Sequence, residues 1–590
     1  MVEPKVFYHE QLAKFEQELE GIKKDLGVSS SLRLGVFVAL SIAIYYSWGF
    51  PKVLVSILLV GVAVFVFLII RHNRMQYERD LKIALIQRNK TELKVLDRDF
   101  YHLPRGQEFK DTEHWYGPDI DLFGKGSFYQ YLNRTSLLGG SKLLADILLS
   151  NNIKDIEQKQ SAIKELAKIP EWRQRFGATA ILVKNELTAD KVISWIKGYA
   201  PFLPKQIRNI ARGFSVLSIL VLVAYFAGWI SGYWVFFVFL LGMAITGKFV
   251  KKVTHLSAWT SKVNSTFAQY SRLLALIEEH EFESELLLTK REDVVNSNES
   301  SSAILKQFSK LLDRLDQRNN ILISLVLNGF FLRDLIITHQ IETWILAHKN
   351  HISDWFNTID FFDAYNSLGN YAFNHQDHIY PSIVESDKTL ESTGLSHPML
   401  DPQKAVRNDI AIRKDEFFII TGANMAGKST FLRTVSLQVV MANVGLPVCA
   451  QSVEYSPIKL ITSMRTSDSL TDDESYFFSE LKRLKFIIDE MGNDKYFIVL
   501  DEILKGTNST DKAAGSQKFI EKLVKLGGTG IIATHDLSLC EVADDFNKVS
   551  NYYFDANIVD DELFFDYKFK KGVCQNMNAS FLLKKMGVVE

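Results

Sequence analysis

Residues 416–437 read EFFIITGANMAGKSTFLRTVSL. The apolar run from Phe417 to Ile420 predicts a buried strand, and helical spacing resumes at Thr430. Between them, residues 422–429 follow the pattern G-x-x-x-x-G-K-S. The two glycines let the backbone turn its N–H groups inward, and the helix that follows adds its positive N-terminal end. This stretch therefore predicts a phosphate-binding loop.

Two side chains of the loop have predicted roles in binding ATP and Mg²⁺. Lys428 is expected to reach the β and γ phosphates, because its ammonium group pairs with their charge. The Ser429 hydroxyl is expected to be a ligand of Mg²⁺. The predicted nucleotide-binding residues of the loop are Gly422, Ala423, Asn424, Met425, Ala426, Gly427, Lys428, Ser429 and Thr430.

Two later strands are predicted to bring the rest of the site. The run from Tyr496 to Leu500 ends in Asp501 and Glu502, and Gly530 to Ala533 is followed by His535. We expect Asp501 to hold Mg²⁺ through water, and Glu502 and His535 to be catalytic: Glu502 orients the attacking water and His535 senses the γ-phosphate. A lone histidine after a strand is more often structural. Here the order of loop, acid pair and histidine is that of an ABC-type ATPase.

Three segments together resemble the ATPase domain of the MutS family of DNA mismatch repair proteins: TGANMAGKSTFLRTVSL, VLDEILKGTNSTD and IIATHD. Ala423 and Ala426 stand where that family commonly has Pro and Gly. The segment SYFFSELKRL, from Ser475, resembles the family's signature stretch, in which a serine of one subunit reaches the nucleotide of the other. The resemblance therefore implies a homodimer formed through the ATPase domains, with Ser475 binding the cofactor in trans.

The resemblance extends more weakly into the helices. Residues 122–149, with the pattern L-x-R-T-x-x-x-G-x-x-L-L, resemble the start of the family's helical core, or lever, domain. The Phe-x-Glu wedge of mismatch readers has no counterpart in the first 110 residues, and Phe478-Ser479-Glu480 belongs to the signature segment. The resemblance implies a clamp or lever motion on DNA, and the missing wedge predicts that any DNA recognition depends on structure and not on mismatches.

Four uncharged runs predict two transmembrane hairpins, each joined by a tight turn. They are Leu34 to Phe50, Val53 to Ile70, Phe214 to Ile230 and Tyr233 to Thr246. The first two contain about 17 or 18 residues and as helices span roughly 26 Å, close to the hydrocarbon thickness of a bilayer. A buried core helix pair is the alternative, but such helices keep a polar stripe. Residues 321–332 are too short and too closely flanked by charge to be a fifth span.

The flanking residues predict the orientation of the hairpins. Aromatic residues crowd the turns, and basic residues lie at the open ends, among them Arg33, Arg71, Lys248, Lys251 and Lys252. By the positive-inside rule, both open ends face the cytoplasm. We therefore expect a multi-pass protein of the inner (cytoplasmic) membrane that contacts lipid through four helices and keeps its soluble domains in the cytoplasm.

Composition sets the remaining bounds. The 590 residues are 47% hydrophobic, which allows several cores. The net charge of −1 argues against a protein coated in basic surface for wrapping nucleic acid, although local basic patches are compatible with it. The three cysteines are widely spaced and form neither a disulfide framework nor a zinc motif.

These inferences predict an α/β ABC-type P-loop ATPase domain, an all-α helical core or lever domain, and two transmembrane helical hairpins. The predicted units are a soluble helix at 1–30 that ends near Gly27, hairpins at 31–72 and 205–252, helical core segments at 73–204 and 253–384, and the ATPase domain at 385–590. The alternative to a DNA clamp is an ABC-type ATPase that drives a membrane or protein-assembly process without DNA. A transporter-type ATPase is disfavoured, because the chain lacks the L-S-G-G-Q signature.

Overall fold

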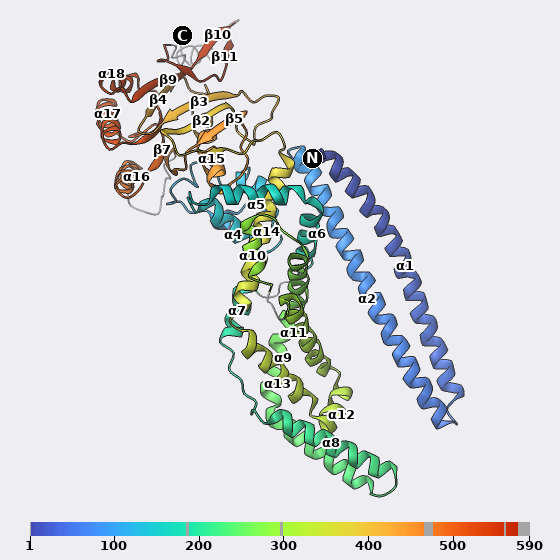
Figure 1. Cartoon of the computed structure of the whole chain (residues 1–590). Helices are drawn as coiled ribbons and strands as arrows, with labels where there is room; N and C mark the ends of the chain where they lie inside the picture. Colours follow the sequence, from blue (N-terminus) through green and yellow to red (C-terminus); the bar gives the residue numbers. More distant parts are fainter. Residues whose placement is uncertain (1, 184–187, 296–298, 465–475, 560–561, 576–590) are drawn as a thin grey trace.

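The computed structural model describes residues 2–183, 188–295, 299–464, 476–559 and 562–575. Two long helical hairpins project from a helical body that carries a domain built from β-sheets and helices (Figure 1). The first hairpin joins the body beside this domain, and the second lies at the far end of the body. The three parts therefore have distinct structural characters: apolar hairpins, an all-helical middle and a mixed α/β end.

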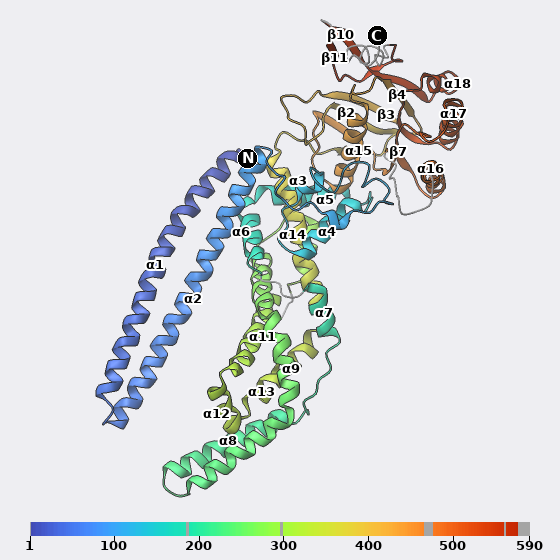
Figure 2. The same cartoon turned by 180° about the vertical axis from the view of Figure 1, so that it is seen from behind.

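The first hairpin consists of α1 (Pro4–Tyr46) and α2 (Pro51–Leu96), which lie side by side (Figures 1 and 2). The expected helix end near Gly27 is wrong, because α1 continues through this residue into the apolar run. A glycine inside a helix costs about 1 kcal/mol relative to alanine. Packing on α2, including the ion pair between Lys82 and Glu18, offsets that cost.

The second hairpin consists of α8 (Ile207–Phe226) and α9 (Gly232–Glu279). Among the described residues, α1, α2, α8 and α9 are long and apolar enough to cross a membrane. At most 17% of the residues in their apolar windows are buried within the protein, so these helices present apolar side chains outward. The predicted boundaries at residues 72 and 252 fall inside α2 and α9, since both helices continue without interruption into the helical body.

A short apolar helix, α12 (Ile321–Phe331), packs on the second hairpin. It has 11 residues, in agreement with the expectation that it is too short for a fifth span. Gly242 of α9 approaches the backbone of Gly329 so closely that a Cβ atom at residue 242 has no room. The two glycines therefore permit a backbone-to-backbone crossing of α9 and α12.

The helical body is organised around α14 (Ile352–Asn374), in which every residue from Phe361 to Phe373 is buried. A helix buried on all sides packs against several neighbours at once. The other helices of the body are α3 (Phe128–Leu132), α4 (Leu138–Leu149), α5 (Ile156–Lys168), α6 (Pro170–Ile181), α7 (Ala189–Lys197), α10 (Glu285–Glu292), α11 (Ser301–Asp316) and α13 (Arg333–His348), with 3-10 turns at Gln107–Phe109 and Gln317–Asn319.

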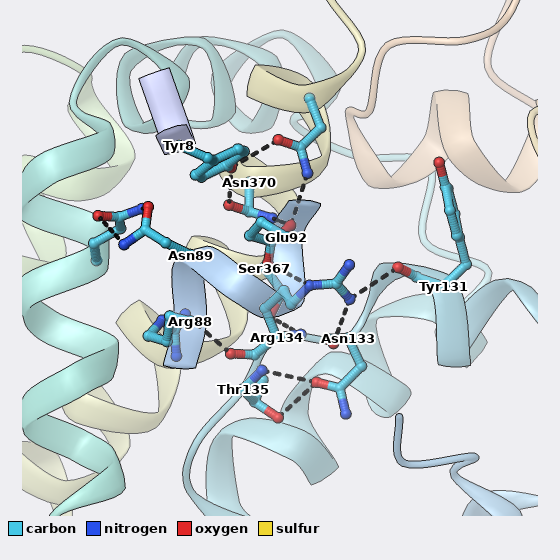
Figure 3. A network of polar contacts seen from close by, with 12 residues as sticks. Tyr8, Arg88, Asn89, Glu92, Tyr131, Asn133, Arg134, Thr135, Ser367 and Asn370 are labelled. Carbon is cyan, nitrogen blue, oxygen red and sulfur yellow. Dashed lines mark hydrogen bonds and ion pairs between the residues drawn. The ribbon is translucent and has the colours of Figure 1, made fainter. Parts of the chain in front are cut away.

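A buried polar network ties the first hairpin to α14 (Figure 3). Glu92 of α2 pairs with Arg134 at 2.5 Å and accepts hydrogen bonds from Asn370 at 3.0 Å and Asn374 at 2.9 Å. Tyr8 of α1 donates to Asn374 at 2.7 Å. Removing one partner of a buried ion pair typically costs 3–5 kcal/mol, roughly, because it leaves the other charge uncompensated. The network therefore fixes both helices of the hairpin to the centre of the body.

The C-terminal domain contains three sheets. The six-stranded sheet has the order β12-β9-β4-β8-β7-β6, in which all neighbours are parallel except β12 and β9. A four-stranded sheet has the order β1-β5-β2-β3, and β10 pairs with β11. The strands are β1 (Ser382–Ile383), β2 (Lys388–Leu395), β3 (Asn408–Arg413), β4 (Phe417–Gly422), β5 (Ser452–Tyr455), β6 (Lys459–Ser463), β7 (Tyr496–Asp501), β8 (Thr529–Ala533), β9 (Val549–Phe554), β10 (Ala556–Val559), β11 (Glu562–Phe565) and β12 (Lys570–Lys571).

The helices of this domain are α15 (Lys428–Val444), α16 (Tyr476–Met491), α17 (Ser509–Lys525) and α18 (Val542–Asp545), with a 3-10 turn at Leu537–Glu541. The most buried of them is α15, which the six-stranded sheet, the four-stranded sheet and the helical body surround. It ends at Gly445 in a left-handed conformation (φ 88°), where the Lys159 ammonium of α5 donates to the carbonyl of Asn443. One buried helix thus extends from the phosphate loop to the helical body.

Candidate functional site

The site lies at the carboxyl ends of three adjacent strands, β4, β8 and β7. The predicted strands Phe417–Ile420, Tyr496–Leu500 and Gly530–Ala533 are confirmed, because they fall within these three elements. Ala533 of the middle strand pairs with Ile420 on one side and with Asp501 on the other. Parallel pairing in this register brings the segments that follow the strands to one edge of the sheet.

The loop between β4 and α15 depends on two glycines. Gly422 has a φ of 147°, and a Cβ atom there would lie 2.5 Å from the carbonyl oxygen of Phe554. Gly427 has a φ of 102° and immediately precedes α15. Because its N-cap is a glycine, no side chain competes for the first N–H groups of this helix. The loop therefore presents a helix N-terminus that suits an anionic phosphate.

Lys428 points back into the loop. Its Nζ atom donates to the carbonyl oxygens of Gly422 at 2.7 Å and Ala423 at 3.0 Å, and lies 3.2 Å from Nε2 of His535. Burial lowers the pKa of Lys428, while the nearby Asp501 and Glu502 carboxylates oppose this effect. Neutral carbonyl groups thus hold the Lys428 amine at the mouth of the loop, and a charged phosphate would bind this amine more strongly than they do.

Ser429 and Asp501 form an oxygen-rich pair. The Ser429 hydroxyl donates to Oδ2 of Asp501 at 2.6 Å, and burial raises the pKa of this carboxyl group. A hydroxyl and a carboxylate oxygen are ligands that Mg²⁺ prefers. The predicted metal residues therefore meet in space, and the chemistry of their donor atoms fits the ion.

Glu502 and His535 also meet. Oε1 of Glu502 lies 3.1 Å from Nε2 of His535, and Lys505 lies 3.8 Å from the other carboxylate oxygen. Burial and the Lys428 charge lower the pKa of His535. Glu502 has a φ of 50°, a strained conformation for a residue with a side chain. Such strain persists where the surroundings fix a side chain for a task, and here it directs the carboxylate toward His535.

A cavity of about 670 Å³ joins these residues to a second, less polar wall. The phosphate-loop end is lined by Ala423, Asn424, Met425, Gly427, Lys428, Ser429, Thr430, Asp501, Glu502 and His535. Of the other predicted loop residues, Ala426 is fully buried, and Gly422 supplies a carbonyl to Lys428. Ser475 lies outside the described residues.

Sequence reasoning missed the residues of the second wall, chiefly His397 and Tyr567, which line the cavity with Leu395 and Val406. The Tyr567 ring lies 3.0 Å from the position a Cβ atom of Gly427 would occupy, and the Tyr567 carbonyl accepts from Asn408 at 3.0 Å. Residues 403–408 contain no aromatic side chain, and Lys404, Ala405, Val406 and Asn408 of this segment line the same cavity. No spacing rule links Tyr567 to the phosphate loop, so only the fold could reveal it.

A second group of metal-type ligands lies outside this cavity. His375, Asp377 and His378 each offer a ligand atom within 4.8 Å of the others. One ring nitrogen of each histidine is already paired with a tyrosine hydroxyl. The three residues line a separate cavity, which the guanidinium groups of Arg98 and Arg407 also line. These positive charges oppose a divalent cation, so we assign no metal to this cluster.

Comparison with known proteins agrees with the geometry. Residues 418–584 match the family model described as MutS domain V. The chain is 29% identical over 254 residues to human MutS protein homolog 4, covering 41% of this chain and 27% of that protein. It is 31% identical over 249 residues to the DNA mismatch repair protein MutS of Thermotoga maritima, covering 41% of this chain and 31% of that protein. The matches thus span about a third or less of these relatives.

Proposed function

Because the chain belongs to the MutS family through the domain matched at residues 418–584, we propose that it is a membrane-anchored enzyme that binds and hydrolyses ATP. The observation that carries this proposal is two groups of side chains that meet beyond three adjacent strand ends, with contacts of 2.6 Å in one group and 3.1 to 3.2 Å in the other. These side chains are Lys428, Ser429, Asp501, Glu502 and His535. In this reading the domain is an ABC-type P-loop ATPase.

The roles follow from the chemistry of each group. Lys428 leaves the loop carbonyls to pair with phosphate oxygens, while Ser429 and Asp501 hold Mg²⁺. Bound Mg²⁺ supplies charge neutralisation at the phosphates. Glu502 orients the attacking water, and His535, beside both Glu502 and Lys428, responds to the γ-phosphate. The cavity wall that contains Tyr567 and His397 would then contact the adenine base of ATP.

We further propose that the working unit is a homodimer whose ATPase domains face each other. This proposal is supported by the resemblance of residues 475–484 to the MutS signature stretch. In the proposed dimer, Ser475 of one subunit contacts the nucleotide bound by the other subunit. ATP binding would close the pair, and hydrolysis would reopen it. The dimer therefore provides a two-state element that the nucleotide can bias.

The four apolar helices support an inner-membrane location, with the soluble parts on the cytoplasmic side. Their outward-facing apolar side chains need a lipid environment, because a soluble protein rarely exposes apolar patches larger than a few hundred Å². Two helices, α2 and α9, extend without interruption from the apolar hairpins into the helical body. Movements of the body are thereby transmitted to the membrane.

Two outputs of the ATPase cycle are consistent with these features. The family relationship favours a clamp or lever acting on DNA through structure and not through mismatches. The continuity of α9, from the body into the apolar hairpin, favours the alternative, in which the lever acts on the membrane or on a protein assembly. A DNA-binding assay with the purified protein, with and without ATP and over a range of salt concentrations, separates them. If the protein does not bind DNA even at low salt, the DNA clamp is ruled out and the membrane or protein-assembly role remains.

Membrane anchoring is tested by alkaline carbonate washing of membranes from expressing cells. We expect the protein to stay in the pellet, and complete release would overturn the membrane proposal. A variant lacking residues 34–71 should also stay, because α8 and α9 still anchor it. Arg33 and His72 are in contact at 3.1 Å across the hairpin, so a short glycine linker can close the deletion without distorting the remaining helices.

A further inference from the structure

A cavity of about 390 Å³ lies where the second hairpin joins the helical body. It is enclosed by the end of α7, the segment 198–202 that follows it, and one face of α9. Its lining residues are Trp195, Gly198, Tyr199, Ala200, Phe202, Lys251, Lys252, His255 and Leu256. This cavity is separate from the nucleotide site and has no role in the mechanism above.

The cavity has the chemistry of an anion site with an aromatic floor. Lys251, Lys252 and His255 are exposed on consecutive turns of α9, and none of the described residues that line the cavity is acidic. Trp195 stacks on Trp259 with ring centroids 5.6 Å apart and planes inclined by 5°. A ligand with a negative head and an apolar body fits such a wall, because tryptophan and lysine at a membrane surface serve both parts.

Residues 198–202, which close the cavity, are held in place by α13. The buried carboxylate of Glu342, on α13, accepts a hydrogen bond from the backbone N–H of Phe202 at 2.8 Å and from the Tyr199 hydroxyl at 3.2 Å. Lys252 lies 5.6 Å from the centre of the Phe202 ring, within the range of a cation–π contact. The body of the protein therefore holds this segment against α9, and the cavity does not depend on a loose loop.

The depth of the cavity relative to the membrane follows from helix geometry. The apolar run of α9 ends at Thr246, and Lys251 lies five residues later, about 7.5 Å further along the helix. His255 lies about 13.5 Å along it. The polar headgroup layer occupies roughly 5–8 Å on each side of a bilayer. Lys251 and Lys252 therefore lie at or just outside the level of the phospholipid phosphates.

We propose that this cavity binds the phosphate headgroup of an anionic phospholipid from the cytoplasmic leaflet. This inference rests on the proposal that α8 and α9 cross the membrane. Lys251 and Lys252 contact the phosphate, and Phe202, beside Lys252, packs on the glycerol backbone and upper acyl carbons. Trp195, which stacks on Trp259 further from the apolar run, faces the polar end of the headgroup together with Tyr199. Because α9 continues into the body, a bound lipid fixes the point at which α9 leaves the membrane.

The test uses the full chain in neutral detergent, with dioctanoyl phosphatidylglycerol as the probe. Binding is read from tryptophan fluorescence and from lipid adducts in native mass spectrometry. We expect the K251Q/K252Q variant to bind at least tenfold more weakly than the wild type. The K251R/K252R variant should retain binding, and K262Q/K310Q, which removes the same charge at exposed positions outside the cavity, should match the wild type. Equal affinity of K251Q/K252Q and the wild type would overturn the proposal.

Two further arms identify the source of the phosphate. Dioctanoyl phosphatidylcholine should bind weakly, and equal binding of this zwitterionic lipid contradicts an anion site. Glycerol 3-phosphate and inorganic phosphate should not compete at tenfold excess, and full competition would assign the cavity to a soluble phosphate. These assays do not require a bilayer. Carbonate release of a protein that still binds phosphatidylglycerol would therefore overturn the membrane proposal and, with it, the leaflet as the source of the lipid. Carbonate resistance without lipid binding would overturn only the headgroup site.

Discussion

The Ser429 hydroxyl donates a hydrogen bond of 2.6 Å to the Asp501 carboxylate, although the two residues are 72 positions apart in the chain. Ser429 lies in the first turn of α15, and Asp501 ends β7, so the contact joins the two halves of the proposed ATP site. In the free protein, each group is the other's hydrogen-bond partner. Ser429 and Asp501 would give up this hydrogen bond when they hold Mg²⁺.

Replacing Lys428 by alanine is expected to weaken ATP binding roughly 10- to 100-fold. A hydrogen bond to a charged group contributes about 1.5–3 kcal/mol, and Lys428 is the buried cation of the phosphate loop. Titration with a fluorescent ATP analogue measures the change. K485A, which removes a lysine from an exposed ion pair with Asp489 on the same domain, is the control and should bind ATP like the wild type. Wild-type affinity in K428A would contradict the proposed phosphate contact.

Glu502→Gln should leave ATP binding intact and reduce hydrolysis by roughly 10²- to 10⁴-fold, the usual contribution of a positioned base. The amide keeps the size of the side chain, but it loses the charge that faces His535 at 3.1 Å. Phosphate release and gel filtration with ATP measure the rate and the expected accumulation of closed dimer. E521Q, on the surface of α17, should hydrolyse ATP normally. Hydrolysis by E502Q at the wild-type rate would show that another group orients the water.

The strands and the loop that carry the proposed site, and the meeting of its side chains, could be predicted because local sequence specifies them. Strand, turn glycines and helix follow one another within residues 416–437, and each acidic or imidazole group directly follows an apolar run. Tyr567 and His397 could not be predicted, since they reach the same cavity from separate segments through tertiary folding. Their positions depend on long-range contacts, such as the hydrogen bond from Asn408 to the Tyr567 carbonyl, which no periodic pattern in the sequence predicts.

The hairpins illustrate the same limit in a different form. Apolar runs marked the correct places, but composition changes from charged to apolar near residue 30, and this change suggested a helix end that does not exist. The charged part of α1 finds its partner in α2, through pairs such as Lys90 with Glu16 at 2.9 Å. A helix boundary depends on backbone geometry and tertiary packing, and a change in polarity alone does not define one.

Two buried carboxyl groups on α14 predict a dependence of stability on pH. Burial and the charge of Asp363 raise the pKa of Asp360 to about 7, and burial raises the pKa of Asp363 to about 6. In the unfolded chain both values are about 4. The folded protein therefore binds more protons than the unfolded chain between about pH 4 and pH 7. Stability should fall as the pH rises through this window and level off above it.

Asp360→Asn tests this dependence, because the amide has no proton to lose. A folded pKa of about 7 against about 4 unfolded corresponds to at most about 4 kcal/mol at pH 8. The melting temperature of D360N should therefore exceed that of the wild type at pH 8, by several degrees, and lose this advantage at pH 5. D146N, at an exposed site on α4, should follow the wild-type profile. Parallel profiles of D360N and the wild type would assign the pH dependence to other groups.

The final prediction concerns DNA mismatches, where this chain differs from the mismatch repair protein that it matches over residues of its C-terminal domain. Reading a mispair in the manner of the family requires a wedge residue inserted from the minor groove and a kinked duplex. Residues 4–46 and 51–96 of this chain form α1 and α2 instead, and the apolar part of both helices is exposed. Any DNA binding should then come from phosphate contacts of the helical body and decrease steeply with salt. Fluorescence anisotropy should give equal affinities, within about threefold or ~0.7 kcal/mol, for a perfect duplex and one with a G·T mismatch. A reproducible tenfold preference for the mismatch at moderate salt would reveal a reader elsewhere in the chain.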